Sequence, residues 1–239
     1  MATSDNPPPR EVVRYGPDIP DEDDLRLLGS VTDKRVLVLG MHGSGSVIAL
    51  AQQGAKVIVV DPDAAKLEQG RAAVERAEAK AEFRQADLAG LAFLAGDSFD
   101  LVLSIYTLAA VDDLNRVFRQ VHRVLKADMP LVVSLPHPAY TMLDRTRPSR
   151  LPDDPVLVAR PYGGGQRSDD GRDADDTTVA ADHTYAPSDA FTAMLRAKFR
   201  LDGLLEPAAN AGGHRSRQWN ELMAWVPPTL ILRARKEGI

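Results

Sequence analysis

Short apolar runs recur along the chain, and longer stretches with helical character separate most of them. The runs are rich in valine, leucine and isoleucine and occupy residues 35–39, 56–60, 98–105, 131–135 and 229–233, and two more polar segments, residues 82–84 and 200–205, are also predicted as strands. Continuous apolar runs of this length are typical of strands buried on both faces of a sheet. Helices are predicted at residues 21–29, 47–53, 62–80, 114–125 and 187–199. This alternation of strands and helices predicts an α/β fold built on a mostly parallel sheet.

Two stretches lack this pattern. Residues 1–20 contain five prolines and predict a flexible N-terminal arm. Residues 139–185 are crowded with proline, glycine and aspartate, and since they follow the strand at 131–135, we expect a lid or insert over the edge where that strand ends. The chain has the length of one α/β domain, so we expect a single domain over residues 21–239.

A glycine-rich turn and an acidic residue mark the first βαβ unit. Gly40, Gly43 and Gly45 follow the first strand, and Asp61 ends the second strand, 21 positions after Gly40. A right-handed crossover brings the turn and Asp61 to the same edge of the sheet. Backbone N–H groups at the helix start can bind polar groups there, and the acid can accept ribose hydroxyls. Because the turn reads G-x-x-G-x-G and not G-x-G-x-x-G, adenosylmethionine, a dinucleotide and a tight turn without a ligand all remain open.

Composition narrows the range of partners. A net charge of -5 and a pI near 5.6 argue against a general nucleic-acid binder, which would be basic. No apolar stretch is long enough to span a membrane, and the polar, acidic N-terminus does not resemble a signal peptide, so we expect a cytoplasmic protein. The chain has no cysteine, which excludes disulfides, thiolate metal sites and cysteine nucleophiles. No acidic pair has convincing metal-ligand spacing, so no metal is expected.

Three histidines are candidates for chemistry. His137 follows the strand at 131–135, at the expected active edge, and imidazole titrates near neutral pH, so it is the first candidate base. A strand-end cap between two prolines is the alternative interpretation. His183, beside Asp182 and close to Tyr185, is the second candidate base, with packing in a loop as the alternative. His42 could contact a cofactor or substrate, or face solvent.

Taken as a series, these segments resemble a known family. The segments VLVLG, VIVVD, FRQADL, FDLVLSIYTLAAVDD, a helix ending in RVLK, and LVVSLPHP occur in the order and spacing of the class I S-adenosylmethionine-dependent methyltransferases of the small-molecule, type 11-like group. The resemblance covers roughly residues 12 to 236. It implies a Rossmann-like, doubly wound, seven-stranded sheet, mostly parallel with the last strand antiparallel. It also implies S-adenosylmethionine as cofactor, a small-molecule acceptor methylated on O, N or C, and a monomer or homodimer.

The resemblance also assigns positions around the cofactor. It implies that the methionine moiety lies over residues 40–45, the ribose on Asp61, and the adenine between Pro62 and the pair Asp87 and Leu88. The pocket floor would be formed by residues 104–106, and residues 14–15 would close over the cofactor carboxylate. The cofactor-binding residues implied in this way are Tyr15, Gly40, Met41, His42, Gly43, Asp61, Pro62, Asp87, Leu88, Ser104 and Tyr106.

The glycine motif departs from the family pattern. Val38 stands where the family usually has an acid that helps hold the cofactor's amino group, and Ser44 stands where a further glycine is usual. Met41 and His42 follow the first glycine. Two alternatives to a methyltransferase therefore stay open: a non-methylating or weakly cofactor-binding protein of the same fold, and an NAD(P)-dependent oxidoreductase.

Overall fold

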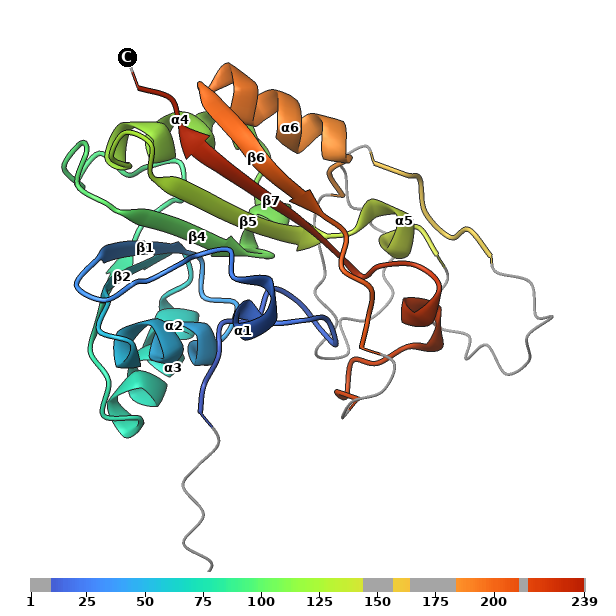
Figure 1. Cartoon of the computed structure of the whole chain (residues 1–239), viewed down its shortest axis with the longest axis horizontal. Helices are drawn as coiled ribbons and strands as arrows, with labels where there is room; N and C mark the ends of the chain where they lie inside the picture. Colours follow the sequence, from blue (N-terminus) through green and yellow to red (C-terminus); the bar gives the residue numbers. More distant parts are fainter. Residues whose placement is uncertain (1–9, 144–156, 164–183, 211–214, 239) are drawn as a thin grey trace, which may run out of the picture.

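The computed structural model of the chain describes residues 10–143, 157–163, 184–210 and 215–238 (Figure 1). Their strands form one seven-stranded sheet in the order β3-β2-β1-β4-β5-β7-β6. The strands are β1 (Arg35–Leu39), β2 (Lys56–Asp61), β3 (Ala81–Gln85), β4 (Leu101–Ile105), β5 (Pro130–Pro136), β6 (Phe199–Leu205) and β7 (Thr229–Lys236). Strands β1 to β5 pair in parallel, whereas β7 runs antiparallel to both β5 and β6. The predicted α/β sheet with an antiparallel last strand is confirmed.

Helices cover both faces of this sheet. In Figure 1, α4 and α6 lie on one face, and α1, α2 and α3 lie on the other. The α-helices are α1 (Glu22–Leu25), α2 (Ser44–Gln52), α3 (Ala64–Arg76), α4 (Leu114–Val124), α5 (Pro138–Thr141) and α6 (Pro187–Arg196), and the 3-10 helices are η1 (Thr107–Ala110) and η2 (Glu221–Ala224). Each face has its own hydrophobic cluster, because side chains along a strand point alternately to opposite faces.

Helix α4 shows how the apolar spacing produces this packing. Its buried residues recur every three or four positions and are Leu114, Val117, Phe118, Val121 and Val124. This spacing places them on one side of the helix, against the sheet. The helix begins where the Asp113 carboxylate accepts a hydrogen bond from the Arg116 amide at 3.1 Å.

The N-terminal segment differs from the prediction. Residues 1–9 lie outside the described residues, but residues 10–20 are not a flexible arm, because Val13, Tyr15 and Ile19 are 1%, 0% and 7% exposed. They pack into the cluster on the α2 and α3 face. The predicted boundary between the arm and the domain, at residue 20, is therefore wrong, because residues 10–20 belong to the domain. The proline content predicted disorder. However, burial of the three apolar side chains stabilises the segment by more free energy than the loss of its conformational entropy costs.

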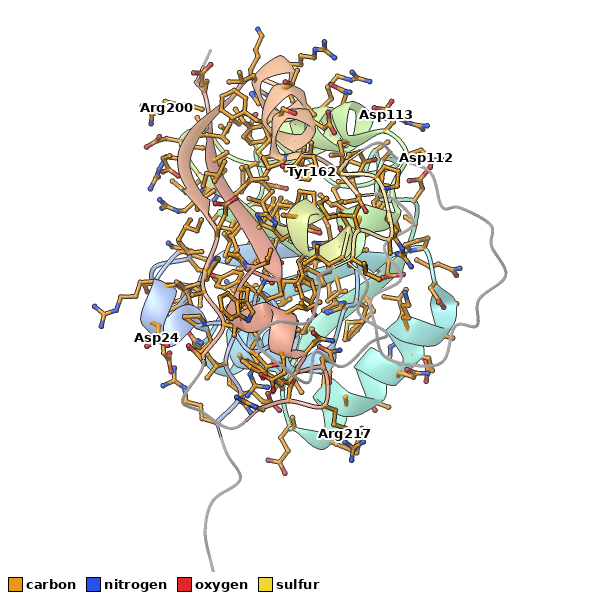
Figure 2. All side chains as sticks on the ribbon, turned by 90° about the vertical axis from the view of Figure 1, so that its right-hand side faces the viewer. Asp24, Asp112, Asp113, Tyr162, Arg200 and Arg217 are labelled. Carbon is orange, nitrogen blue, oxygen red and sulfur yellow. The ribbon has the colours of Figure 1, made fainter. Side chains whose placement is uncertain are left out.

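The predicted lid can be compared with the structure only in part. Helix α5 and residues 157–163 are described, with an antiparallel bridge between Leu143 and Val158, whereas residues 144–156 and 164–183 lie outside the described residues. Helix α5 packs against η2 through a small apolar cluster of Tyr140, Leu222 and Met223. Figure 2 views the molecule from this side, onto the carboxyl ends of the parallel strands, which we call the carboxyl edge. Among the described residues, no helix combines the length and apolar character that crossing a membrane requires.

Candidate active site

The glycine turn after β1 is held in place by close backbone contacts. Gly40 has φ +86, and a Cβ atom built on it would lie 2.0 Å from Oγ1 of Thr107, so only glycine is tolerated there. The Gly40 amide donates to the Val60 carbonyl at 2.7 Å. Helix α2 then begins at Ser44, and Gly43, which precedes it as the N-cap residue, provides no side-chain cap. The first N–H groups of α2 consequently remain available to a ligand.

Asp61 joins the turn after β1 to the turn after β2. Its Oδ2 accepts the Met41 amide at 2.6 Å and its Oδ1 accepts the Asp63 amide at 2.7 Å. The residue is 2% exposed. A carboxylate has about four acceptor sites, so two remain for ribose hydroxyls, although side chains must shift before a ligand reaches them.

A cavity of about 160 Å³ lies between the N-terminal segment and the glycine turn. It is lined by Val12, Arg14, Val38, Gly40, His42, Gly43, Gly45, Ser46, Val47 and Ile105. Typical small-molecule sites have about 300–1,000 Å³, so the cavity has room for one end of a cofactor. A Cβ atom on Gly43 would meet no atom within 4 Å, which shows that the turn is open on this side.

His42 and Tyr106 come together beside this cavity. Their ring centroids are 5.1 Å apart and the rings are tilted by 50°. Tyr106 has the left-handed backbone conformation, with φ 57, which is unusual for an aromatic residue and is typical of functional sites. Its hydroxyl forms a hydrogen bond of 2.5 Å with Thr229 Oγ1. His42 as a residue is exposed, yet desolvation of its ring lowers its pKa, and the positive charge of Lys66 lowers it further.

Some of the residues expected around the adenine and at the pocket floor are exposed, and others are buried. Pro62 and Asp87 are exposed after β2 and β3, while Leu88 is buried in the cluster on the α4 face. Ser104 is fully buried, and its hydroxyl donates to the Leu39 carbonyl at 2.9 Å, so it joins β4 to β1. Its neighbour Ile105 lines the cavity.

Sequence reasoning missed several residues of this region. Gln85 Nε2 donates to the Pro62 carbonyl at 3.1 Å and so links the turns after β2 and β3. Val12 and Ser46 line the cavity, and the Arg14 amide donates to Ser46 Oγ at 3.3 Å. The apolar pair Val12 and Val13 was the available signal that this segment packs on the domain.

Tyr15 and Arg14 have different roles in the structure. The Tyr15 hydroxyl donates to Glu22 Oε2 at 2.5 Å, and Tyr15 is fully buried and does not line the cavity. Burial, and the charge of Glu22 next, raise the pKa of Tyr15 far above its ordinary value, so the phenol stays protonated. Arg14 is exposed and lines the cavity.

His137 is held at both ring nitrogens. Its Nδ1 accepts the Ala139 amide at 3.1 Å, which caps α5, and its Nε2 lies 2.8 Å from Glu206 Oε1. Since Nδ1 accepts, the proton of the neutral ring lies on Nε2 and is donated to Glu206. Both ring nitrogens of His137 are therefore engaged in hydrogen bonds within the protein. His183 lies outside the described residues.

Comparison with known proteins identifies a family. The family model described as Methyltransferase domain matches residues 37–133, which run from β1 to β5 and include the glycine turn, Asp61 and Tyr106. No significant match was found among curated proteins.

Solved structures of methyltransferases share the fold. An S-adenosylmethionine-dependent methyltransferase from Mesorhizobium loti has 25% identity and a TM-score of 0.69, over 88% of this chain and 94% of that one. A putative S-adenosylmethionine-dependent methyltransferase from Listeria monocytogenes has 19% identity and a TM-score of 0.68, over 89% and 94%. Geranyl diphosphate C-methyltransferase from Streptomyces coelicolor A3(2), in complex with Mg²⁺, geranyl diphosphate and S-adenosyl-L-homocysteine, has 14% identity and a TM-score of 0.59, over 90% and 78%. The last two likenesses concern the fold alone.

The residues present suit the cofactor of this family. The uncapped start of α2 faces the cavity, and Asp61 keeps acceptor sites for a ribose. The sheet order differs from the classic dinucleotide order 3-2-1-4-5-6, because the antiparallel β7 lies between β5 and β6. Residues 37–133 thus match the methyltransferase family, and the chain has the fold of the class I S-adenosylmethionine-dependent methyltransferases, whose cofactor is S-adenosylmethionine.

Proposed function

We propose that this protein transfers the methyl group of S-adenosylmethionine to a small-molecule acceptor. The observation that carries the proposal is the cavity at the uncapped start of α2, with Arg14 on one side and the glycine turn on the other. Asp61 lies behind the same turn and holds its backbone. The amino-acid end of the cofactor would fit the cavity at the start of α2, and its ribose would contact Asp61.

In this proposal, different residues of the carboxyl edge bind different parts of the cofactor. The amides at the start of α2 bind polar groups of the amino-acid end, and Asp61 accepts the ribose hydroxyls. Pro62 and Asp87, which are exposed, would border the adenine, whereas the side chain of Leu88 is buried. When bound, the cofactor would supply a methyl group activated by its sulfonium: the acceptor would bond to the methyl carbon in line as the carbon–sulfur bond breaks and S-adenosylhomocysteine leaves, so positioning would supply much of the rate. His42 and Tyr106 border the sulfonium.

A small molecule is the acceptor class that the chain favours. The net charge of -5 opposes binding to a nucleic-acid backbone. The Streptomyces coelicolor enzyme of the same fold acts on geranyl diphosphate. His183 is our candidate base for an acceptor that must lose a proton, and His137 qualifies only if its cap on α5 opens.

Thermal unfolding tests whether the protein binds the cofactor. A ligand at about 100 times its dissociation constant stabilises a protein by about 2.7 kcal/mol, which should raise the midpoint by about 5 to 10 °C here. We expect this shift with S-adenosylhomocysteine and S-adenosylmethionine, and none with NAD. No shift with either adenosyl ligand at millimolar concentration would contradict cofactor binding.

Enzymatic turnover tests whether the protein transfers the methyl group to a small molecule. We expect S-adenosylhomocysteine to accumulate when a panel of small phenols, amines, carboxylic acids and activated carbon acids is supplied with S-adenosylmethionine. Cofactor binding without turnover on any of these classes would favour the alternative, a protein of the same fold that does not methylate.

A further inference from the structure

The position where the family usually carries an acid is apolar in this protein. Val38 is 3% exposed and lines the cavity. A valine side chain cannot accept a hydrogen bond, so it cannot bind an ammonium group. If S-adenosylmethionine binds as proposed, its α-amino group needs an acceptor other than the side chain at position 38, and a carboxylate is the strongest one for a charged amine.

Glu11, on the N-terminal segment, places its carboxylate beside Gly45, which lines this cavity. A Cβ atom built on Gly45 would lie 2.7 Å from Glu11 Oε2, so the carboxylate occupies the space that the missing side chain leaves open. Gly45 lines the cavity, and so do Val12 and Arg14, which follow Glu11 closely along the chain. The carboxylate is thus placed beside the first turn of α2, where the helix dipole favours negative charge.

Glu11 and Arg14 together match the two charges of an amino acid. The carboxylate of Glu11 suits an α-ammonium group, and the guanidinium of Arg14 suits an α-carboxylate. Both residues lie on one short segment that the core anchors through Val13 and Tyr15. The charges that a bound amino acid requires are therefore held at a defined place.

We propose that Glu11 replaces the acid missing at Val38 and binds the α-amino group of the cofactor. The inference rests on the proposed function, because it concerns the same cavity. It makes the N-terminal segment part of the cofactor site. A purely structural role is the competing explanation, in which Glu11 only balances the positive end of α2.

Binding measurements with two ligands separate these explanations. The ligands are S-adenosylhomocysteine, which has the amino-acid end, and 5′-methylthioadenosine, which lacks it. We expect Glu11→Gln to weaken S-adenosylhomocysteine at least about tenfold and to change 5′-methylthioadenosine by less than about twofold. The matched control is Asp24→Asn, which removes the same charge from the outer side of α1, where Asp24 is exposed (Figure 2). It should leave both affinities unchanged.

The other outcomes overturn the inference in distinguishable ways. Equal affinity of the wild type and Glu11→Gln for S-adenosylhomocysteine would show that Glu11 does not contact the amino group. An equal loss for both ligands would show that Glu11 acts on the fold of the site and not on the amino group. If the wild type binds neither ligand, the proposed function itself fails, and the inference fails with it.

Discussion

At the scale of single residues, Asp61 holds together the two turns of the proposed cofactor site. Its two carboxylate oxygens accept amides from Met41 and Asp63, on two different turns, at 2.6 and 2.7 Å. Hydrogen bonds to a buried charged group contribute more than neutral ones. The residue therefore serves the fold and, in our proposal, the ribose.

Replacing Asp61 by asparagine should affect both roles. Asparagine has one acceptor oxygen, so one of the two amides loses its partner, and we expect unfolding to become easier by about 1–3 kcal/mol. Affinity for S-adenosylhomocysteine should fall as well. Urea denaturation and calorimetric titration measure the two effects. Asp63→Asn is the control, because Asp63 caps α3 and asparagine caps equally well. Similar behaviour of the two variants would contradict the role given to Asp61.

His42 provides a second prediction at this scale, which concerns pH. Its pKa lies below the ordinary value of 6.5, because its ring is desolvated and Lys66 is positive. Above pH 6.5 the ring is neutral in both the folded and the unfolded chain. As the pH falls below 6.5 the unfolded chain takes up the proton first, so the stability that the neutral ring contributes is lost on acidification.

The same protonation should discriminate between two ligands. S-adenosylmethionine carries a sulfonium charge that S-adenosylhomocysteine lacks, so a protonated His42 beside it repels only the former. We expect the ratio of their affinities to shift toward S-adenosylhomocysteine between about pH 7.5 and about pH 5. In His42→Gln the ratio should not depend on pH. A wild-type ratio that stays constant over this range would place His42 away from the sulfonium.

At the scale of elements, the segment from residue 10 to α1 is part of the domain and carries one side of the cavity. Glu22 holds it together, because its carboxylate accepts the Tyr15 hydroxyl at 2.5 Å and the amides of Leu27 and Leu28 at 2.9 and 2.8 Å. These contacts fix the segment that presents Glu11 and Arg14.

Removing the Glu22 carboxylate should loosen this segment. In Glu22→Ala three donors lose their partner, and we expect a loss of at least about 1–3 kcal/mol in the free energy of unfolding. Affinity for S-adenosylhomocysteine should also decrease, although Glu22 does not line the cavity. Asp23→Ala is the control, since among the described residues the Asp23 carboxylate has an exposed ion pair of 3.7 Å with Arg10, worth less than about 1 kcal/mol. If Glu22→Ala kept full affinity, the segment would not contribute to binding.

At the scale of the whole molecule, the sheet separates two hydrophobic clusters, and only one of them lies behind the cofactor cavity. Val38 and Ile105, which line the cavity, belong to the cluster on the α2 and α3 face. Phe118 and the rest of the α4 stripe belong to the other cluster. The stability of the molecule depends on both, but the shape of the cavity depends on one.

A pair of core substitutions tests this division. Phe118 and Tyr15 are both fully buried, one in each cluster. Replacing either with alanine should cost about 3–5 kcal/mol of stability. Only Tyr15→Ala should weaken S-adenosylhomocysteine, measured under conditions where both variants are folded. Equal losses of affinity in the two variants would show that the cavity depends on the whole fold.

Much of this architecture follows from local pattern. Strands were predicted at the positions of all seven observed strands. Five of these are apolar runs, which have few ways to be buried other than inside a sheet, whereas β3 and β6 contain polar, exposed residues. The position of Asp61 on the carboxyl edge followed from the handedness of βαβ crossovers. The stripe of α4 predicted its buried face.

Contacts between distant segments could not be derived in this way. The Ser104 hydroxyl reaches the carbonyl of Leu39, and Tyr106 meets Thr229 more than a hundred residues away. Nothing in the spacing of these residues encodes such a partner. The burial of Tyr15 and the meeting of Glu11 with Gly45 are of the same kind.

By itself, then, the sequence determined the elements, their order and the edge at which the glycine turn and Asp61 meet. These features depend on the periodicity of burial and on chain handedness, both of which act over short stretches. Only the tertiary structure decided that residues 10–20 complete the cavity and that His137 caps a helix. Those outcomes depend on contacts between side chains that are far apart in the sequence. Such side chains come close enough to pack and form hydrogen bonds only when the sheet has formed.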